Sequence, residues 1–399
     1  MEFRLTVCQL ALDSCFAPDG SVDAGRIEAN FARTERRLRE ERRPDQPQLF
    51  LLPEFSYQGW GPGRSVADWN AAATPIPGPY TDRIGDLARE LDCYIAGTLC
   101  ERLAEFPGRH FLTGFLIGPD GAILLRYRKA YAFSSKTRPG DVYEAYVRHY
   151  GREALFPVVE TPLGRIGMAI AYDIFWPEVP RALALRGAEI LLNPFGSARV
   201  PAQQDTAFGL ARRTRAFENV MYVAAANIGP MSSMPDGPHD RWPSEIVDYE
   251  GRVLASSPDG AECAVSANID VESLRRHRAR PMANWLAQLQ PFLHAPDYAA
   301  ARLWPPGHWE HRPMQDGAEQ LDLEAQVARR LADGEHSTSE EFFNDRRSIS
   351  PYPETRQALL LCKRARPHAP RFRMSRPYSR AAMRPLRRRR RTAGRYRRP

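Results

Sequence analysis

Two charged residues stand at the ends of apolar segments, where a carboxylate and an amine could take part in proton transfer. Glu54 ends the apolar run that begins at residue 49, and Lys129 ends a strand that is predicted to begin at Ile123. A carboxylate in such surroundings is expected to have a raised pKa, which suits it to act as a general base. Each residue also has a plainer interpretation: Glu54 as a salt-bridged or helix-capping acid, and Lys129 as a solvated charge at a strand end.

The segment 167–178 is typical of a sharp turn between a buried strand and a helix. Its apolar run ends at Ala171, and a helix is expected to start at Pro177, because proline is favoured at the first helical position and Glu178 suits the positive end of the helix. Such an elbow exposes a side chain to a cleft and leaves backbone N–H groups free, as a nucleophile and an oxyanion site require. Alanine offers no nucleophilic atom there.

The elements that must position these residues follow an α/β pattern, in which short apolar runs alternate with amphipathic segments over the first 270 residues. Several strands are apolar throughout, which favours a sheet buried between helices and a second sheet. Strands are predicted at 3–10, 49–52, 93–97, 111–117, 123–127, 166–171, 190–193, 221–226, 245–248 and 261–269. Helices are predicted at 26–42, 81–91, 177–187 and 205–218, with Ile27, Phe31 and Leu38 on one stripe of the first.

The chain is expected to divide into three parts. Residues 1–272 are predicted to form the α/β domain. Residues 273–346 are aromatic and Pro-rich, with a helix expected at 322–332, and are too apolar for a linker, so we expect them to pack on the domain or on a second subunit. Residues 347–399 are expected to be unfolded, and they are rich in Arg from residue 363.

The net charge of +8 is the sum of a basic tail and an acidic remainder of the chain. Residues 363–399 contain fifteen Arg, one Lys and no acid, which leaves 40 basic and 48 acidic residues in the preceding part of the chain. Such a tail could bind nucleic acid by neutralising phosphates. Because no binding motif accompanies the charge, we favour a solvated appendage and do not expect a nucleic-acid partner.

Neither a metal nor another cofactor is expected. The six cysteines are scattered without C-x-x-C spacing, and the nine histidines include no H-x-x-x-H pair. The N-terminus lacks a basic region followed by a long apolar stretch, and no window approaches the ~18 apolar residues that a membrane span needs. We therefore expect a cytoplasmic protein without a membrane partner.

Taken together, these segments resemble the nitrilase superfamily of carbon–nitrogen hydrolases, whose catalytic set is glutamate, lysine and cysteine in that chain order. Pro53-Glu54 is similar to the P-E general-base segment, residues 127–129 to the Y-R-K segment, and residues 171–178 to the C-Y-D-x-x-[FW]-P-E elbow. Further matches in the same order, over roughly residues 3–270, are 161–167 before the elbow, 187–190 with Asn193-Pro194 after it, 215–219 as the R-A-x-E-N helix, and 247–255 as a late hairpin.

The resemblance implies a four-layer α-β-β-α sandwich and a role for each matched residue. Glu54 would be the general base, and Lys129 with the backbone N–H of Tyr172 would stabilise the oxyanion. A second glutamate would position the lysine or the substrate amide; Glu144 is the better candidate and Glu153 the alternative. We expect Glu54, Lys129 and residue 171 to converge at the ends of three adjacent strands around one small cavity.

The chain departs from the family pattern at the nucleophile, where it has Ala171. The family reaction passes through a thioester, so turnover by the covalent route should be absent in this form. Glu54 and Lys129 could still bind and polarise a substrate. An engineered cysteine-to-alanine variant, which we favour, and a natural pseudoenzyme that binds a ligand or a protein are both compatible with the sequence.

The sequence at the elbow also indicates which class of substrate to expect. True nitrilases resemble C-W-E-N there, and Tyr172-Asp173 does not match. Hydrolases of N-carbamoyl-D-amino acids place two arginines where this chain has Ile174 and Phe175, so their clamp for the substrate carboxylate is missing. The resemblance therefore predicts an amide or carbamoyl substrate whose distal part is apolar or bound in another way. The residues expected to contact it or its oxyanion are Tyr172, Phe175, Trp176, Asn193, Phe195 and Arg199, although a surface position is the plainer interpretation of Arg199.

The resemblance also implies a homodimer or a higher homo-oligomer. Members of the superfamily pair two subunits through helices near the elbow, and the predicted helices 177–187 and 205–218 are the candidates. The aromatic stretch 281–310 could extend that contact.

Overall fold

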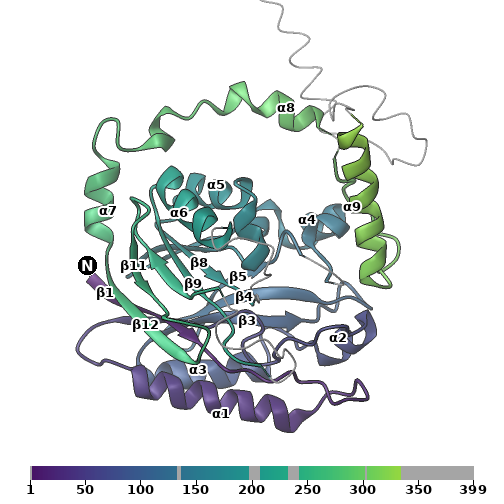
Figure 1. Cartoon of the computed structure of the whole chain (residues 1–399), viewed down its shortest axis with the longest axis horizontal. Coiled ribbons are helices and arrows are strands. Elements are labelled where there is room, and N and C mark those ends of the chain that lie inside the picture. The colour runs from purple at the N-terminus through teal and green to yellow at the C-terminus, as the bar shows by residue number, and fades with distance from the viewer. Residues whose placement is uncertain (1, 133–135, 197–206, 232–241, 302, 334–399) are drawn as a thin grey trace, which may run out of the picture. The chain divides into compact units, whose positions relative to one another are not determined.

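Two six-stranded β-sheets form the centre of the structure, a computed structural model that describes residues 2–132, 136–196, 207–231, 242–301 and 303–333 (Figure 1). The first sheet has the order β12 (Cys263–Asp270), β1 (Glu2–Gln9), β2 (Gln48–Leu51), β3 (Tyr94–Glu101), β4 (Phe111–Ile117) and β5 (Ile123–Arg128). The second has the order β11 (Val253–Ser256), β10 (Glu245–Val247), β9 (Tyr222–Ala226), β8 (Ile190–Pro194), β7 (Gly164–Met168) and β6 (Val158–Thr161). In each sheet a parallel core, β1-β2-β3 or β7-β8-β9, is extended by antiparallel strands.

Helices cover the outer face of each sheet. Figure 1 shows α1 (Ala24–Glu41) and α3 (Pro79–Leu91) on the first sheet, and α5 (Glu178–Leu185) and α6 (Ala207–Asn219) on the second. This arrangement is the predicted four-layer α-β-β-α sandwich, and the prediction is confirmed.

The burial of the strands explains why their sequences are apolar without alternation. Every residue of β2, β3, β4, β8 and β9 is buried. One face of each strand meets the other sheet and the opposite face meets helices, so neither face can be polar at low cost. The outer strands β6 and β11 are partly exposed.

Helix α1 illustrates how local sequence sets an element. Its N-cap, Asp23, accepts hydrogen bonds from the backbone N–H groups of the first turn. The predicted stripe of Ile27, Phe31 and Leu38 is buried against the first sheet, and charged residues occupy the opposite side. The helix runs over 24–41, close to the predicted 26–42.

Several short elements were not predicted as such: β6, β11, α2 (Val66–Ala72), α4 (Tyr143–Tyr150) and α7 (Val271–Arg278). Helices of seven or eight residues are marginal in isolation, so tertiary contacts decide whether they form. In α4, for example, the ring of Tyr146 is fully buried and its hydroxyl donates to the carbonyl of Ala154.

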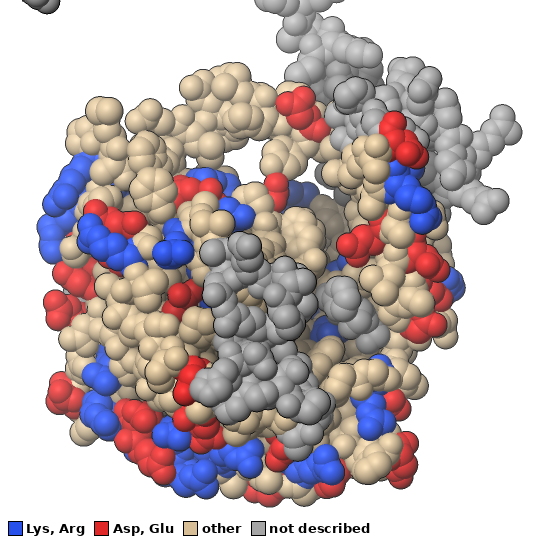
Figure 2. Space-filling model, viewed as in Figure 1, with Lys and Arg blue, Asp and Glu red and all other residues tan. Residues whose placement is uncertain are grey.

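The chain after α7 runs around the second sheet's helices as a segment of short turns and helices, shown in green in Figure 1. It comprises two 3-10 turns (Trp285–Gln288 and Pro291–Leu293), α8 (Ala295–Ala300) and α9 (Gly317–Ala332). In the space-filling view, the part around α8 stands clear of the rest of the domain along some of its length (Figure 2). The later part is tightly packed, because Trp309 is 1% exposed and Arg109 donates to its carbonyl.

Large apolar side chains are exposed both on this segment and on the helices near the elbow. They are Met282, Trp285, Phe292, Leu293 and Tyr298 on the segment, and Leu185, Leu210 and Phe217 on α5 and α6. The homo-oligomer expected from the sequence remains a prediction.

The Arg-rich tail lies outside the described residues, and none of the described helices has the length and apolar character to cross a membrane.

Candidate active site

Glu54 and Lys129 form a buried ion pair. The Nζ of Lys129 lies 2.7 Å from Oε1 of Glu54, and the backbone N–H of Gly196 donates to Oε2 at 3.0 Å. The two residues are 4% and 5% exposed, so Lys129 is not a solvated strand-end charge. The carboxylate and the amine that the sequence placed at two separate strand ends are therefore in direct contact.

The pair and the elbow come from two sheets. Glu54 follows β2 and Lys129 follows β5, with β3 and β4 between these strands in the first sheet, whereas Ala171 follows β7 in the second sheet. The expectation of three adjacent strands is therefore wrong. The two sheets stack so that the ends of strands from both sheets lie at one edge. The order of the strands along the chain does not show this.

The elbow has the strained backbone that its predicted role requires. Strand β7 ends at Met168, three residues earlier than predicted, and a 3-10 turn spans Ala171–Phe175. Ala171 has φ of +45°, a left-handed conformation that a residue with a Cβ rarely adopts, and it is 6% exposed. Such strain persists only where surrounding contacts impose it, and it is common at catalytic positions.

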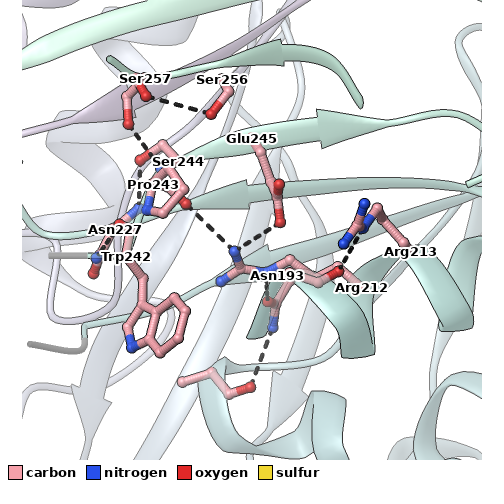
Figure 3. Close-up of polar contacts among 12 residues, drawn as sticks. Asn193, Arg212, Arg213, Asn227, Trp242, Pro243, Ser244, Glu245, Ser256 and Ser257 are labelled. Carbon is pink, nitrogen blue, oxygen red and sulfur yellow. Dashed lines mark hydrogen bonds and ion pairs between the residues drawn. The ribbon is translucent and has the colours of Figure 1, made fainter. Parts of the chain in front are cut away.

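The side chain of Asn193 is hydrogen-bonded to the backbone of the elbow, and Figure 3 shows Asn193 beside Arg212. Its Nδ2 donates to the carbonyl of Ala169 at 2.7 Å and lies 3.4 Å from that of Ala171. Its Oδ1 accepts from Nε of Arg212, which is fully buried and also bonded to Glu245 at 3.1 Å. Asn193 was predicted to contact the substrate, and its contacts are those of a residue that fixes the backbone at the nucleophile position.

Asp173 connects the elbow to the segment that carries Lys129. Its Oδ2 accepts from the hydroxyl of Tyr127 at 2.8 Å and from the backbone N–H of Ile170 at 2.9 Å, and its Oδ1 accepts from the N–H of Tyr131 at 2.8 Å. Burial raises the pKa of its carboxyl from the usual 3.8 to about 6, although the nearby charge of Lys129 opposes the shift. The second and first sheets are thus joined at the candidate site by one side chain.

Replacing Asp173 by Asn should lower the free energy of unfolding by about 1–3 kcal/mol, because an amide NH2 would face a backbone N–H. The folded protein binds a proton here up to a pH of about 6 and the unfolded chain only up to about 3.8, so the stability contributed by this group falls as pH rises between those values. The Asn variant should lack that component. Urea unfolding at pH 4 and pH 7 measures both effects, and a stability difference independent of pH would contradict the linkage.

Aromatic rings surround the elbow. Trp176 stacks on Tyr131 at 4.2 Å and meets Tyr172 edge-on at 4.7 Å, and Phe175 packs on Phe208 at 4.6 Å. Tyr172, Phe175 and Trp176 are half-buried and could contact a ligand.

Two further residues, Phe195 and Arg199, were predicted to contact the substrate. Phe195 is fully buried, its carbonyl accepts from the N–H of Glu54, and its ring lies 3.9 Å from the guanidinium of Arg212. Arg199 lies outside the described residues.

Both candidates for a second catalytic glutamate are exposed, whereas the Glu54–Lys129 pair is buried. Glu144 is exposed on α4, and among the described residues it makes no hydrogen bond or ion pair with Glu54 or Lys129. The side chain of Glu153 is 85% exposed and pairs with Arg186 on the surface. Neither position supports the role that the resemblance implied. The prediction relied on spacing along the chain, and this spacing does not determine whether a side chain reaches the ends of the strands that carry the pair.

Two features of the site had no signal in the sequence. Lys136 is 5% exposed near the pair, and burial together with the charge of Lys129 lowers its pKa to about 8. The C-terminal segment also contacts the chain that follows Lys129: Gln320 of α9 donates to the carbonyl of Ala132 at 2.8 Å, and the guanidinium of Arg138 lies 4.7 Å from the ring of Trp304. The aromatic composition of this segment predicted packing but not its location.

Comparison with known proteins agrees with this architecture. The model of the carbon-nitrogen hydrolase family matches residues 4–279. The omega-amidase NIT2 of Xenopus tropicalis is 31% identical over 235 residues, covering 58% of this chain and 79% of the relative, and that of Bos taurus is 29% identical over 280 residues, covering 69% and 91%. Among solved structures, Nit3 of Saccharomyces cerevisiae, a member of the nitrilase superfamily, has 21% identity and a TM-score of 0.53, with 70% of this chain and 95% of that chain covered. An amidase from Nesterenkonia sp. AN1 has 20% identity and a TM-score of 0.51, with 74% and 97% covered. The chain therefore belongs to the carbon–nitrogen hydrolase family.

Proposed function

We propose that this chain is built to hydrolyse an amide or carbamoyl bond of a small molecule, and that the form with Ala171 binds such a compound without turning it over. The buried contact between Lys129 and Glu54, at 2.7 Å beside the strained elbow, supports this proposal most directly. In a site shielded from water, the amine can polarise a carbonyl while the carboxylate moves a proton.

With a cysteine at position 171 the reaction would proceed in two halves. Glu54 takes the thiol proton, the sulfur attacks the carbonyl carbon, and Lys129 with the backbone N–H of Tyr172 stabilises the oxyanion. The C–N bond breaks as the nitrogen takes the proton from Glu54 and leaves as ammonia or an amine, and a thioester remains. Glu54 then takes a proton from water, the hydroxide attacks the thioester, and the acid product leaves as the thiol regains its proton.

The relatives support an amide as the substrate class. Several of them are omega-amidases, and the amidase from Nesterenkonia has been solved in complex with acrylamide in a form with a glutamate replaced by glutamine and a cysteine by alanine. In that protein, then, an alanine at the cysteine position is compatible with a bound amide. Since Ile174 and Phe175 stand where carbamoyl hydrolases of amino acids have arginines, we favour an amide over an N-carbamoyl amino acid.

A natural pseudoenzyme is the second candidate, and Ala171 itself favours it. A protein that only binds an amide needs Glu54 and Lys129 but no thiol. The two candidates predict the same ligand and differ in whether a restored thiol gives turnover.

Titration calorimetry of the Ala171 protein with butyramide tests the binding that both candidates share. Replacing Glu54 by Gln should weaken binding about ten- to a hundredfold, because a charge-assisted hydrogen bond to the amide nitrogen is lost. Glu40→Gln is the matched control, since that side chain is 52% exposed on α1, and it should leave affinity unchanged. Equal affinities for the Glu54→Gln variant and the unaltered protein would place the ligand elsewhere and reject the proposed site.

A further inference from the structure

The chain that follows Lys129 is held from two sides. On one side, Asp173 of the elbow accepts a hydrogen bond from the N–H of Tyr131 at 2.8 Å. On the other side, Nε2 of Gln320, near the start of α9, donates to the carbonyl of Ala132 at 2.8 Å. The backbone that carries the candidate catalytic lysine therefore lies between the elbow and the C-terminal segment.

The hydrogen bond from Gln320 is shielded from water. Gln320 is 4% exposed and Ala132 is 3% exposed, so water has little access to replace the bond if it is lost. Among the described residues, Oε1 of Gln320 has no hydrogen-bond partner. Burying an amide with an unpaired oxygen costs free energy that a leucine of similar volume would avoid. The glutamine is therefore better explained by the carbonyl that its Nε2 holds than by packing alone.

A series of contacts connects Gln320 to the first sheet. The guanidinium of Arg109, two residues before β4, donates to the carbonyl of Trp309. The indole N–H of Trp309, which is 1% exposed, donates to Glu319 at 3.2 Å, and Glu319 precedes Gln320 in α9. The side chain that holds Ala132 is thus supported from a rigid element, which limits how far it can move.

The same C-terminal segment contacts the chain after β5 at a second place. The N–H of Gly307 donates to the carbonyl of Gly140 at 2.8 Å. The guanidinium of Arg138 lies 4.7 Å from the ring centroid of Trp304 and 5.6 Å from that of Trp309. At these distances the face of a ring attracts a cation. The segment and the chain after β5 are therefore joined over several residues and not by one contact.

The residues that supply this support lie outside the part of the chain that matches the carbon–nitrogen hydrolase family. The match ends at residue 279, so it includes Glu54 and Lys129 but neither Trp309 nor Gln320. The support is therefore added to the matched domain by a segment that the family model does not include.

We propose that Gln320 is a positioning residue for the reaction: by holding the carbonyl of Ala132, it keeps Nζ of Lys129 in place for the oxyanion. This inference rests on the proposed function, in which Lys129 stabilises that oxyanion. An error of about 1 Å in the placement of a catalytic group can lower a rate about a hundredfold. A buried hydrogen bond three residues from the lysine is close enough to control its position on that scale.

Hydrogen exchange followed by mass spectrometry tests whether the contact holds the chain. Gln320→Leu keeps the volume of the side chain and removes the donor. Exchange in a peptide covering 127–132 should become about two- to tenfold faster, as expected for the loss of one buried hydrogen bond. Gln315→Leu is the matched control, since Nε2 of Gln315 also donates to a backbone carbonyl, that of Pro313 at 2.9 Å, but its side chain is exposed. The control should leave exchange in this peptide unchanged.

Steady-state kinetics in the Ala171→Cys background test the consequence for catalysis. Gln320→Leu should lower kcat for butyramide about ten- to a hundredfold and change KM less than about threefold, because the oxyanion that Lys129 stabilises is absent from the bound substrate. The Tm of this variant should stay within about 3 °C of its parent, so that the lower kcat does not reflect unfolded enzyme. Gln315→Leu should change neither constant.

The outcomes separate the role of Gln320 from the proposed function. If Ala171→Cys hydrolyses butyramide and Gln320→Leu retains its kcat, the positioning role is rejected and the amide hydrolase stands. Unchanged exchange at 127–132 rejects the positioning role whatever the kinetics show. If Ala171→Cys is inactive toward every amide in a panel, the proposed function fails, and the catalytic role of Gln320 fails with it.

Discussion

Restoring the thiol with Ala171→Cys should raise ammonia release from small primary amides by at least about 10⁴-fold over the Ala171 protein, since removing a catalytic nucleophile costs on the order of 10⁶ in related covalent mechanisms. The structure provides the remaining components: a left-handed backbone at 171, Asn193 hydrogen-bonded to the elbow backbone, and the Lys129–Glu54 pair at the same edge of the sheets. A thioester trapped from an amide substrate, and detected as an added mass on the protein, would show the covalent route directly.

Two further variants test whether the restored activity depends on the thiol and on Glu54. Ala171→Ser supplies a hydroxyl of similar size but much weaker nucleophilicity, so its activity should remain close to that of the Ala171 protein. The double variant Ala171→Cys with Glu54→Gln should lose the restored activity because the thiol proton has no acceptor. If Ala171→Cys folds, binds amides and still releases no ammonia from any amide or carbamoyl compound in a panel, the chain is a binding protein on an enzyme scaffold.

Arg128→Ala should lower the free energy of unfolding by about 3–5 kcal/mol, because it would leave a buried carboxylate without its partner. The guanidinium of Arg128 donates from Nε and Nη2 to the two oxygens of Glu101 at 2.8 and 3.0 Å, and both side chains are at most 4% exposed. Its charge also lies 4.3 Å from the ring centroid of Tyr150. Urea unfolding of the variant measures the loss.

The surface pair Arg39 and Glu90 is a matched control, because it is also bidentate, at 2.7 and 2.8 Å, while its side chains are 45% and 50% exposed. Arg39→Ala should cost less than about 1 kcal/mol, since solvent screens an exposed pair. Replacing Arg128 and Glu101 together by Met and Leu should cost less than Arg128→Ala alone, as neither charge then remains buried. Equal losses of unfolding free energy for Arg128→Ala and Arg39→Ala would mean that the buried pair contributes no more to stability than the exposed one.

The effect of Arg128→Ala should extend to the candidate site. Lys129 is the next residue, and the backbone after β5 is held by Asp173 through Tyr127 and the N–H of Tyr131. A variant that remains folded should therefore also bind amides less tightly.

The sequence by itself determined the layers of the fold and the chain order of the site. Strands such as β9 are apolar throughout, and this pattern requires protein on both faces whatever the rest of the chain does. The positions of Glu54 and Lys129 at strand ends and of Ala171 at an elbow also follow from local patterns, because a strand, a turn and a helix start are set by residues close together in the chain.

Only the tertiary structure decided which side chains meet. Glu54 and Lys129 are 75 residues apart, and Lys136 joins their surroundings through a segment with no pattern of its own. Glu144 has the sequence spacing of a catalytic residue and yet lies exposed on α4, whereas Asp173 links the two sheets. The reason is physical: periodicity specifies which face of an element is buried, but the contact between two side chains depends on the stacking and register of elements that are distant in the sequence.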